Sequence, residues 1–179
     1  MTHSAPPSSI ASTVNLELFY FDIEGKAEPI RLAAAKGGPG LASFKDTRLT
    51  RGEFAALQAT PGALAYGQVP ALQVNGGEVL TQSAAILKYV GTQVGLYPDH
   101  NGVLAARVDA LLDFEADAFA GLTVSRYPGR FGFGALGLQG TQDRSCPQTA
   151  RVRAELNATV LPKHLGHLEA LLARSPTGW

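Results

Sequence analysis

The order of apolar and polar positions early in the chain predicts short strands that alternate with helices. Residues 16–21 (LELFYF) form an apolar and aromatic run, which predicts a buried strand, and residues 44–49 predict a second, more polar strand. Between them, Pro29 stands early in AEPIRLAAAKGG and two glycines follow at 37–38. This pattern predicts a helix, because proline is tolerated in a first helical turn and glycine ends helices. Residues 51–58 carry a short helical pattern.

The next part of the chain predicts a hairpin followed by a helix. Residues 59–68 contain proline and glycine, which indicates a loop. Residues 69–74 predict a strand opened by a proline, an Asn-Gly-Gly turn follows at residues 75–77, and residues 78–80 predict the return strand. From Gln82 onward apolar residues are spaced by three or four, as in a helix. The resulting order, βαβαββα, indicates one compact sheet with helices on its faces.

The pattern changes after about the first hundred residues. Residues 103–124 predict a long amphipathic helix, and residues 126–147 are rich in glycine and aromatic residues without a clear period. Residues 149–173 are helical again, but Pro162 should start a new helix there or kink this one. We therefore expect a boundary around residues 97–101 and an all-helical second domain.

The composition excludes some classes of partner. The chain has 15 basic and 15 acidic side chains and a formal net charge of zero, so we expect no nucleic-acid partner. No run is long and apolar enough to span a membrane, and the opening segment lacks the basic start and apolar stretch of a secretory signal. We expect a cytoplasmic protein with no membrane partner, and a disordered tail at residues 1–14.

Cys146 is the single cysteine of the chain. One cysteine cannot form an internal disulfide, which favours a reducing compartment. It lies in a stretch rich in Gly, Ser and Pro, with no His or helix N-terminus evident nearby to activate it as a nucleophile. We interpret it as an incidental loop thiol.

Two segments carry a resemblance to a known family. Residues 16–32 (LELFYFDIEGKAEPIRL) and 66–90 (YGQVPALQVNGGEVLTQSAAILKYV) closely resemble the glutathione-binding half of cytosolic glutathione S-transferases, nearest to the sigma-type branch that includes the glutathione-dependent prostaglandin D synthases. The resemblance implies an α/β thioredoxin-like domain over residues 15–97. It implies an all-α C-terminal domain over residues 101–179, which we expect to be incomplete because family members normally continue for several more helices.

By this resemblance, the hydroxyl of Tyr20 points at the sulfur of glutathione. The chemistry fits, because a free thiol has a pKa near ~8.5 and a hydrogen bond donated to the thiolate favours the charged form. Without the resemblance, Tyr20 is also an ordinary strand residue.

The resemblance implies two further contacts with glutathione. Val69-Pro70 matches a cis proline that frees the backbone of the preceding residue to pair with the cysteinyl part of glutathione; a trans proline at a strand edge is the alternative. Gln82 and Ser83 match residues that bind the γ-glutamyl end at a helix N-terminus, whose positive end attracts a carboxylate. The alternative for Ser83 is an ordinary helix cap.

Other matches are weaker or depart from the family pattern. The remaining residues that the resemblance places at the glutathione site are Lys26, Phe54, Gln58, Gln68 and Asp117. Lys26 stands where the branch usually has arginine, Phe54 where it often has tryptophan, and Gln68 where it often has lysine. Asp117 matches an aspartate that reaches the glutathione amine across a dimer, and a solvated helix carboxylate is the alternative. Glu28 and Arg31 also match, and we expect them to form a structural ion pair.

The resemblance implies a glutathione transferase that conjugates glutathione to a hydrophobic electrophile, in detoxification or in related isomerase chemistry. It implies glutathione as co-substrate, no metal, and a homodimer. One alternative is a non-catalytic member of the same fold with a structural or protein-interaction role, which the changes at Lys26, Phe54 and Gln68 favour. A thiol-disulfide enzyme is disfavoured, because no cysteine lies near Tyr20.

Overall fold

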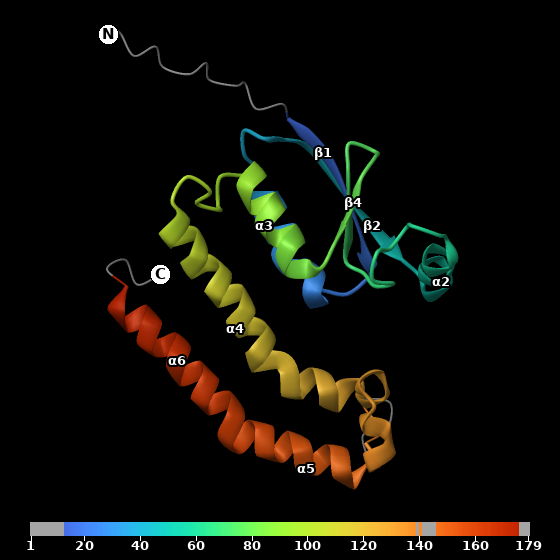
Figure 1. Ribbon diagram of the computed structural model, residues 1–179, viewed down its shortest axis with the longest axis vertical. Helices are drawn as coiled ribbons and strands as arrows, with labels where there is room; N and C mark the ends of the chain where they lie inside the picture. Colours follow the sequence, from blue (N-terminus) through green and yellow to red (C-terminus); the bar gives the residue numbers. More distant parts are fainter. Residues whose placement is uncertain (1–12, 139, 141–145, 176–179) are drawn as a thin grey trace. The chain divides into compact units, whose positions relative to one another are not determined.

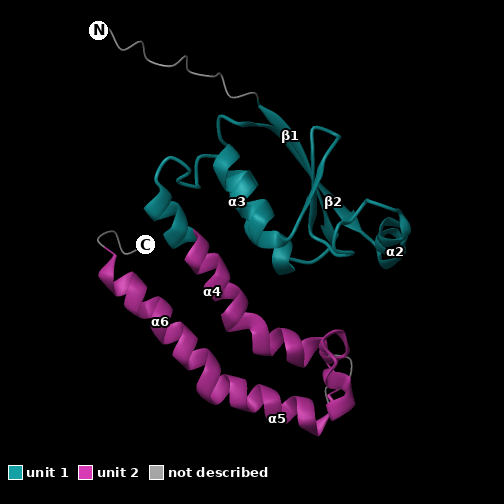
Figure 2. Cartoon of the chain, in the orientation of Figure 1, with its two compact units in different colours: residues 1–108 teal, residues 109–179 magenta. Residues whose placement is uncertain are grey.

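The computed structural model describes residues 13–138, 140 and 146–175. The chain forms two compact units, residues 1–108 and residues 109–179 (Figure 2). Most of the tail predicted at residues 1–14 lies outside the described residues.

The first unit is built on a four-stranded mixed sheet (Figure 1). Its strands are β1 (Val14–Phe21), β2 (Leu41–Leu49), β3 (Ala71–Val74) and β4 (Val79–Thr81), in the spatial order β2-β1-β3-β4. β1 pairs in parallel with β2, whereas β3 is antiparallel to both β1 and β4. The βαβ crossover and the hairpin predicted from the sequence are both present.

Four helical segments accompany the sheet. A 3-10 turn, η1 (Gly25–Ala27), leads into α1 (Glu28–Lys36), in which Pro29 lies in the first turn as predicted. The others are α2 (Arg51–Ala59) and α3 (Ser83–Gln93). The predicted element order, βαβαββα, and the thioredoxin-like fold of this unit are confirmed.

The core of this unit lies between one face of the sheet and helices α1 and α3. Alternate residues of β1 point to this face, because side chains of a strand alternate between its two sides. All four are buried, and they pack against Ile30 of α1 and Ile86 and Val90 of α3. The four β1 residues are Val14, Leu16, Leu18 and Tyr20.

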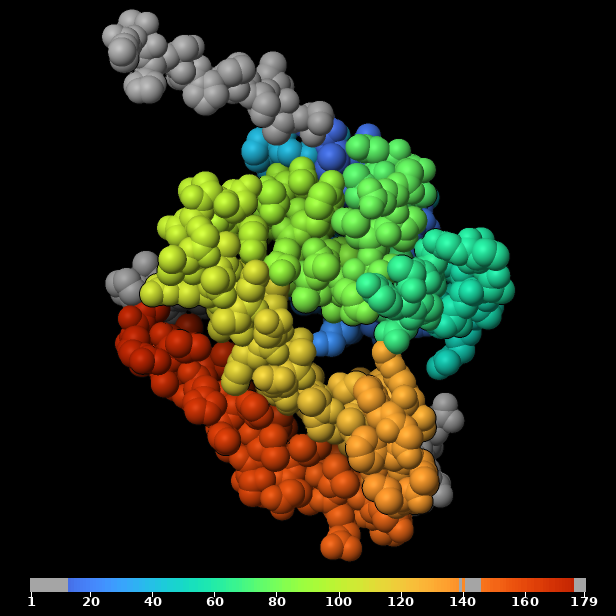
Figure 3. All heavy atoms as spheres, viewed as in Figure 1, coloured from blue at the N-terminus to red at the C-terminus, as the bar shows by residue number. Residues whose placement is uncertain are grey.

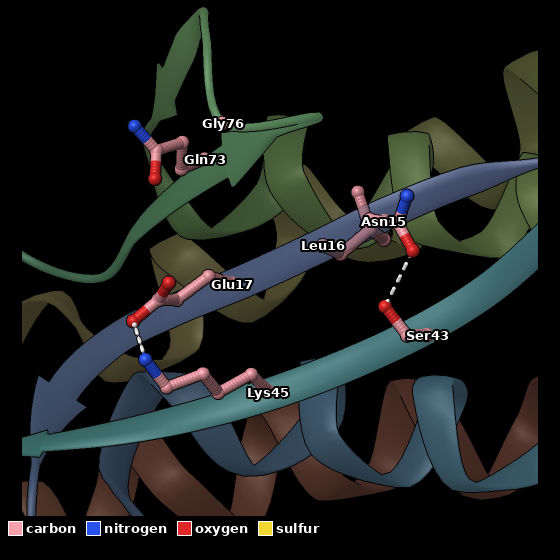
Figure 4. A pocket seen from close by; sticks show the side chains of 7 residues that line it. All are labelled: Asn15, Leu16, Glu17, Ser43, Lys45, Gln73 and Gly76. Carbon is pink, nitrogen blue, oxygen red and sulfur yellow. Dashed lines mark hydrogen bonds and ion pairs between the residues drawn. The ribbon is translucent and has the colours of Figure 1, made fainter.

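The opposite face of the sheet is mostly polar, with α2 at one end. Lys45 Nζ of β2 lies 2.7 Å from Glu17 Oε1 of β1, and Figure 4 shows the two side chains reaching toward each other. The Phe54 ring of α2 packs edge-on against Phe21, with centroids 5.1 Å apart. α2 lies at the surface (Figure 3) and has no buried residue, so this contact fixes its place on the sheet.

The second unit is helical, as predicted. α4 (Gly102–Arg126) begins in the first unit and continues into the second, and is followed by two 3-10 turns, η2 (Pro128–Phe131) and η3 (Phe133–Leu136). α5 (Pro147–Glu155) and α6 (Leu161–Arg174) are joined by a π-helical turn, η4 (Leu156–Val160). Pro162 has no N–H to donate to the preceding turn, and the break predicted there takes the form of this wide turn.

Two predictions for this region are wrong. α4 is not clearly amphipathic, because large apolar side chains such as Leu111 and Phe119 are exposed and Ser125 is its one buried residue. Cys146 is not a loop thiol remote from a helix. It is the N-cap residue of α5, its side chain is buried, and its Sγ donates to the carbonyl oxygen of Gly137 at 3.4 Å. Residues 141–145, immediately before it, lie outside the described residues.

Candidate functional site

The strand register brings three predicted segments to one end of the sheet. Phe19 of β1 is opposite Ala71 of β3, and Ala71 is opposite Thr81 of β4. The end of β1 that carries Tyr20, the Val69-Pro70 bond before β3, and the Gln82-Ser83 junction after β4 therefore meet at the same end of the sheet. Segments that are more than sixty residues apart in the sequence become neighbours through antiparallel pairing.

Tyr20 is held from several directions near the start of α1. Its side chain is 8% exposed. Its hydroxyl oxygen accepts a hydrogen bond from the backbone N–H of Lys26 at 3.3 Å, and the Arg31 guanidinium lies 5.8 Å from the ring centroid. No acceptor for the hydroxyl proton occurs among the described residues, so that proton is available to a ligand.

The bond between Val69 and Pro70 is cis, as the resemblance implies. Pro70 is buried, whereas Val69 is partly exposed. In the described part of the chain, no turn or loop hydrogen bond engages the backbone of Val69. An extended peptide can pair with such a backbone segment as an added strand does.

Gln82 and Ser83 form the N-terminus of α3. The backbone of Gln82 has φ 74° and ψ 113°, a conformation that residues other than glycine rarely adopt. Ser83 is the first helical residue and no side chain caps the helix, so the ordinary capping role for Ser83 is wrong. With no acidic residue in the first turn, the free N–H groups there present a positive end to an anionic ligand.

The weaker candidates are placed as follows. Phe54 packs edge-on against Phe21, whose ring lies next to that of Tyr20. Gln58 donates from Nε2 to the carbonyl oxygen of Gly67 at 2.6 Å, which ties α2 to the loop before the cis proline. Lys26 and Gln68 are exposed.

Asp117 stands apart from these residues. It is exposed on α4, within the second compact unit. Its predicted contact with glutathione across a dimer is not tested by a single chain.

Glu28 and Arg31 form the predicted ion pair, at 3.1 Å between Oε2 and Nη1. Arg31 also donates from Nε to Oδ2 of Asp46 at 3.0 Å. The site's α1 is therefore anchored to β2.

Sequence reasoning missed Gly25. It has φ +45°, and a Cβ atom added to it would lie 2.6 Å from the hydroxyl oxygen of Tyr20. The only signal in the sequence is a glycine five residues after the tyrosine, in a turn that many glycines could fill.

Two hollows at the surface of the first unit do not coincide with these residues. One, of about 180 Å³, lies on the polar face of the sheet (Figure 4), and a wider one of about 500 Å³ is lined by Arg48 and acidic residues near the end of β1. Neither contains a predicted glutathione contact. An extended peptide that pairs with exposed backbone groups needs no closed cavity, so this end of the sheet stays a candidate peptide site.

Among the residues that the structure describes, two carboxylates have lowered pKa values, and neither belongs to the candidate site. The pKa of Glu17 is lowered first by a hydrogen bond from Lys45 and then by one from Thr47. The pKa of Glu53 is lowered by hydrogen bonds from the side chain and backbone of Thr50. Within the described residues, no group of three or more His, Cys, Asp or Glu could hold a metal ion, and no helix there is long and apolar enough to cross a membrane.

The chain is similar to known proteins of one family. The family model "Glutathione S-transferase, N-terminal domain" matches residues 16–92, the part that contains the β1, cis-proline and α3 segments. "Glutathione S-transferase 1" from Ascaris suum is 37% identical over 160 residues, which are 89% of this chain and 68% of the relative. "Glutathione S-transferase S1" from Drosophila melanogaster is 38% identical over 79 residues, 44% of this chain and 29% of the relative.

A solved structure extends the likeness to both units. The crystal structure of the glutathione S-transferase from Ascaris lumbricoides superposes with a TM-score of 0.67 at 34% identity, covering 90% of this chain and 69% of that chain. The fold, the matched family segment and the relatives agree, and the chain belongs to the glutathione S-transferase family.

Proposed function

We propose that this protein is a glutathione transferase in which the Tyr20 hydroxyl stabilises the thiolate of bound glutathione. The observation that supports this most is the state of that hydroxyl. The hydroxyl oxygen accepts a hydrogen bond from the Lys26 N–H, and the hydroxyl proton is left for a ligand. The cis proline and the start of α3 lie at the same end of the sheet. A thiolate at that position would accept the proton in a charge-assisted hydrogen bond.

The energetic demand on this contact is modest. Lowering the thiol pKa from ~8.5 by about 2 units takes about 3 kcal/mol of preferential stabilisation of the thiolate. A hydrogen bond to a charged group contributes about 1.5–3 kcal/mol, and backbone dipoles can supply the remainder. The thiolate then attacks the electrophile, so the protein contributes positioning and ionisation and forms no covalent intermediate.

The other contacts proposed for glutathione use backbone groups at the same end of the sheet. Val69 pairs with the cysteinyl part, and the N–H groups near Gln82 and Ser83 hold the γ-glutamyl carboxylate. Gln68 and Lys26 stand near the glycyl end and the thiol. Gln68 offers a neutral donor where a cation would add charge, so glutathione affinity should lie below that of a lysine-bearing relative.

The subclass, the assembly and the location are also proposals. The segments around Tyr20 and the cis proline favour a sigma-like enzyme that acts on hydrophobic electrophiles or in related isomerisations. We propose a cytoplasmic homodimer in which Asp117 contacts the glutathione of the partner subunit, and domains at residues 15–97 and 101–179. Sedimentation of the wild type and of Asp117→Ala, with and without glutathione, tests the assembly.

Calorimetric titration with reduced glutathione tests the main proposal. Wild type and Tyr20→Phe should bind about equally, but only wild type should raise thiolate absorbance at neutral pH. Tyr89→Phe is the matched control, because Tyr89 packs against the core and is not one of the residues of the candidate site. A folded wild type that binds no glutathione would overturn the proposal. It would favour the non-catalytic alternative, which the departures from the family pattern at Lys26 and Gln68 support.

A further inference from the structure

Gly25 lies against the hydroxyl end of Tyr20. A Cβ atom at residue 25 would lie 2.6 Å from Oη, 3.1 Å from Cε1 and 3.3 Å from Cζ of Tyr20. Favourable contacts between carbon atoms occur at about 3.5–4.0 Å. No side chain therefore fits at residue 25 while the ring of Tyr20 keeps this position.

Other glycines of the first unit share the backbone conformation but not this contact. Gly37, Gly62, Gly76 and Gly95 have positive φ angles of 66°, 77°, 71° and 72°, and a Cβ added to any of them would meet nothing within 4 Å. Their torsion angles alone favour glycine. Gly25, with φ +45°, combines that preference with a close approach to one particular hydroxyl.

The close approach also brings a donor to the hydroxyl. The residue after Gly25 donates its backbone N–H to Tyr20 Oη at 3.3 Å. On another side, the Arg31 guanidinium lies 5.8 Å from the ring centroid, and the side chain as a whole is buried. The ring thus has little room to pivot, and the missing side chain at Gly25 is what lets the turn close on it.

We propose that Gly25 is a positioning residue, which holds the Tyr20 hydroxyl where it can donate to the thiolate of bound glutathione. This inference rests on the proposed function. A side chain at residue 25 pushes the hydroxyl away from its place, and a shift of about 1 Å is enough to lose a well-aligned hydrogen bond. Glutathione still binds, because the proposed backbone contacts at Val69 and at the start of α3 come from other segments.

The test compares Gly25→Ala with Gly95→Ala. Gly95 follows α3 at the end remote from Ser83, so its replacement brings a similar backbone strain without touching Tyr20. Thiolate absorbance is measured against pH at saturating glutathione, with affinity by calorimetry and turnover on an aryl halide. In Gly25→Ala the pKa of the bound thiol should rise by about one to two units and kcat at neutral pH should fall about tenfold or more, with Kd changed less than about threefold. Gly95→Ala should match wild type in all three.

The outcomes separate this inference from the proposed function. If wild type does not ionise bound glutathione, the proposed function fails and the inference fails with it. If wild type ionises the thiol and Gly25→Ala does so at the same pKa, the inference alone is overturned. In a Tyr20→Phe background, Gly25→Ala should have no further effect on the thiol pKa. An additional rise would contradict the proposal that Gly25 acts through the Tyr20 hydroxyl.

Two further variants keep the test decisive if Gly25→Ala folds poorly. Gly25→Asn introduces the same Cβ, and asparagine tolerates positive φ better than alanine. The nearest atom to that Cβ is the hydroxyl oxygen. Gly25→Ala combined with Tyr20→Phe should therefore recover part of the melting temperature lost in Gly25→Ala, whereas strictly additive losses would overturn the inference.

Discussion

Arg31 of α1 donates a hydrogen bond from Nε to Oδ2 of Asp46 in β2, at 3.0 Å. The same guanidinium donates from Nη1 to the backbone oxygen of Ile23 at 2.8 Å and to Glu28 at 3.1 Å. One side chain thus joins the helix, the neighbouring strand and the turn that follows Tyr20. Residues 22–26, which form the turn between β1 and α1, are exposed, so this polar network holds the turn in place.

Replacing Arg31 by methionine should lower the free energy of unfolding by about 2–4 kcal/mol. The arginine side chain is 10% exposed, and its loss removes one of the two arginine partners of the Asp46 carboxylate and the side-chain donor to two backbone carbonyl groups. Urea denaturation measures the change. Arg48→Met is the matched control: it also removes a contact with Asp46, but Arg48 is 40% exposed and the cost should stay below about 1 kcal/mol. Equal losses in the two variants would contradict the role given to burial.

Two helical glycines in the second unit should respond to alanine in opposite directions. Gly166 of α6 has open space around it, so Gly166→Ala should raise stability by up to about 1 kcal/mol through helix propensity. A Cβ on Gly121 of α4 would collide with the side chain of Leu156, which is buried in the π-helical turn. Gly121→Ala should therefore lower stability by about 1 kcal/mol, because overpacking outweighs the gain in propensity. Thermal melting of both variants decides, and stabilisation in both would show that Leu156 moves aside freely.

The capping box of α2 should make stability depend on acidic pH. Thr50 Oγ1 accepts from the Glu53 N–H, and the Glu53 carboxylate accepts from the backbone N–H of Thr50 at 2.7 Å. These contacts lower the pKa of Glu53 in the folded state. Its contribution is therefore complete above the pKa of the unfolded chain and is lost as the pH falls through the lower, folded pKa.

Glu53→Gln should flatten this pH dependence. The difference in melting temperature between pH 7 and pH 3 should be smaller in the variant, and part of the difference should remain because the pKa of Glu17 is lowered as well. Thr50→Ala should flatten the pH dependence in part, because it removes the side-chain hydrogen bond to the Glu53 carboxylate and keeps the backbone one. The loss of the Thr50 helix cap itself should lower stability at neutral pH by about 1 kcal/mol. A pH dependence equal to that of wild type in both variants would contradict the assignment.

The order of elements could be predicted because each has a strong local signal. The apolar run at residues 16–21, the proline early in α1 and the Asn-Gly turn each predict local structure on their own. The starts of strands could not be predicted as well. β2 begins at Leu41, three residues before its predicted start, because Leu41 pairs with Val14 on a different segment. A partner that far away in the sequence leaves no local pattern.

The candidate site divides in the same way. Tyr20, the cis proline and the start of α3 could be predicted from segments that resemble a family, and the sheet register explains why they meet. The roles of Gly25 and of the Gln82 backbone could not, since the sequence does not give torsion angles set by tertiary packing. The prediction that Cys146 is a loop thiol was wrong for a related reason. The sequence before it has no helical period, and α5, of which Cys146 is the N-cap residue, begins at Pro147.

We expect that the strained backbone of Gln82 lowers the stability of the protein and that it supports glutathione binding. At φ 74° and ψ 113° a side chain costs about 1–3 kcal/mol, whereas glycine adopts this conformation without strain and loses about 0.4–1 kcal/mol through the flexibility of the unfolded chain. Gln82→Gly should therefore stabilise the protein by about 1 kcal/mol. If the Gln82 side chain contacts the γ-glutamyl group in addition to the backbone N–H groups proposed above, glutathione affinity should fall about tenfold, which corresponds to one hydrogen bond of about 1.4 kcal/mol.

Asn75→Gly separates these two effects. Asn75 also has positive φ, at 51°, but its Oδ1 accepts the backbone N–H of Asn15 at 2.8 Å, so glycine there removes a contact while relieving the strain. It should not stabilise the protein, and it should leave glutathione affinity unchanged because the hairpin turn lies at the end of β3 remote from the cis proline. Melting curves and calorimetry on both variants give the answer. A Gln82→Gly variant that is more stable and binds glutathione as wild type does would show that the strain serves no contact with this ligand.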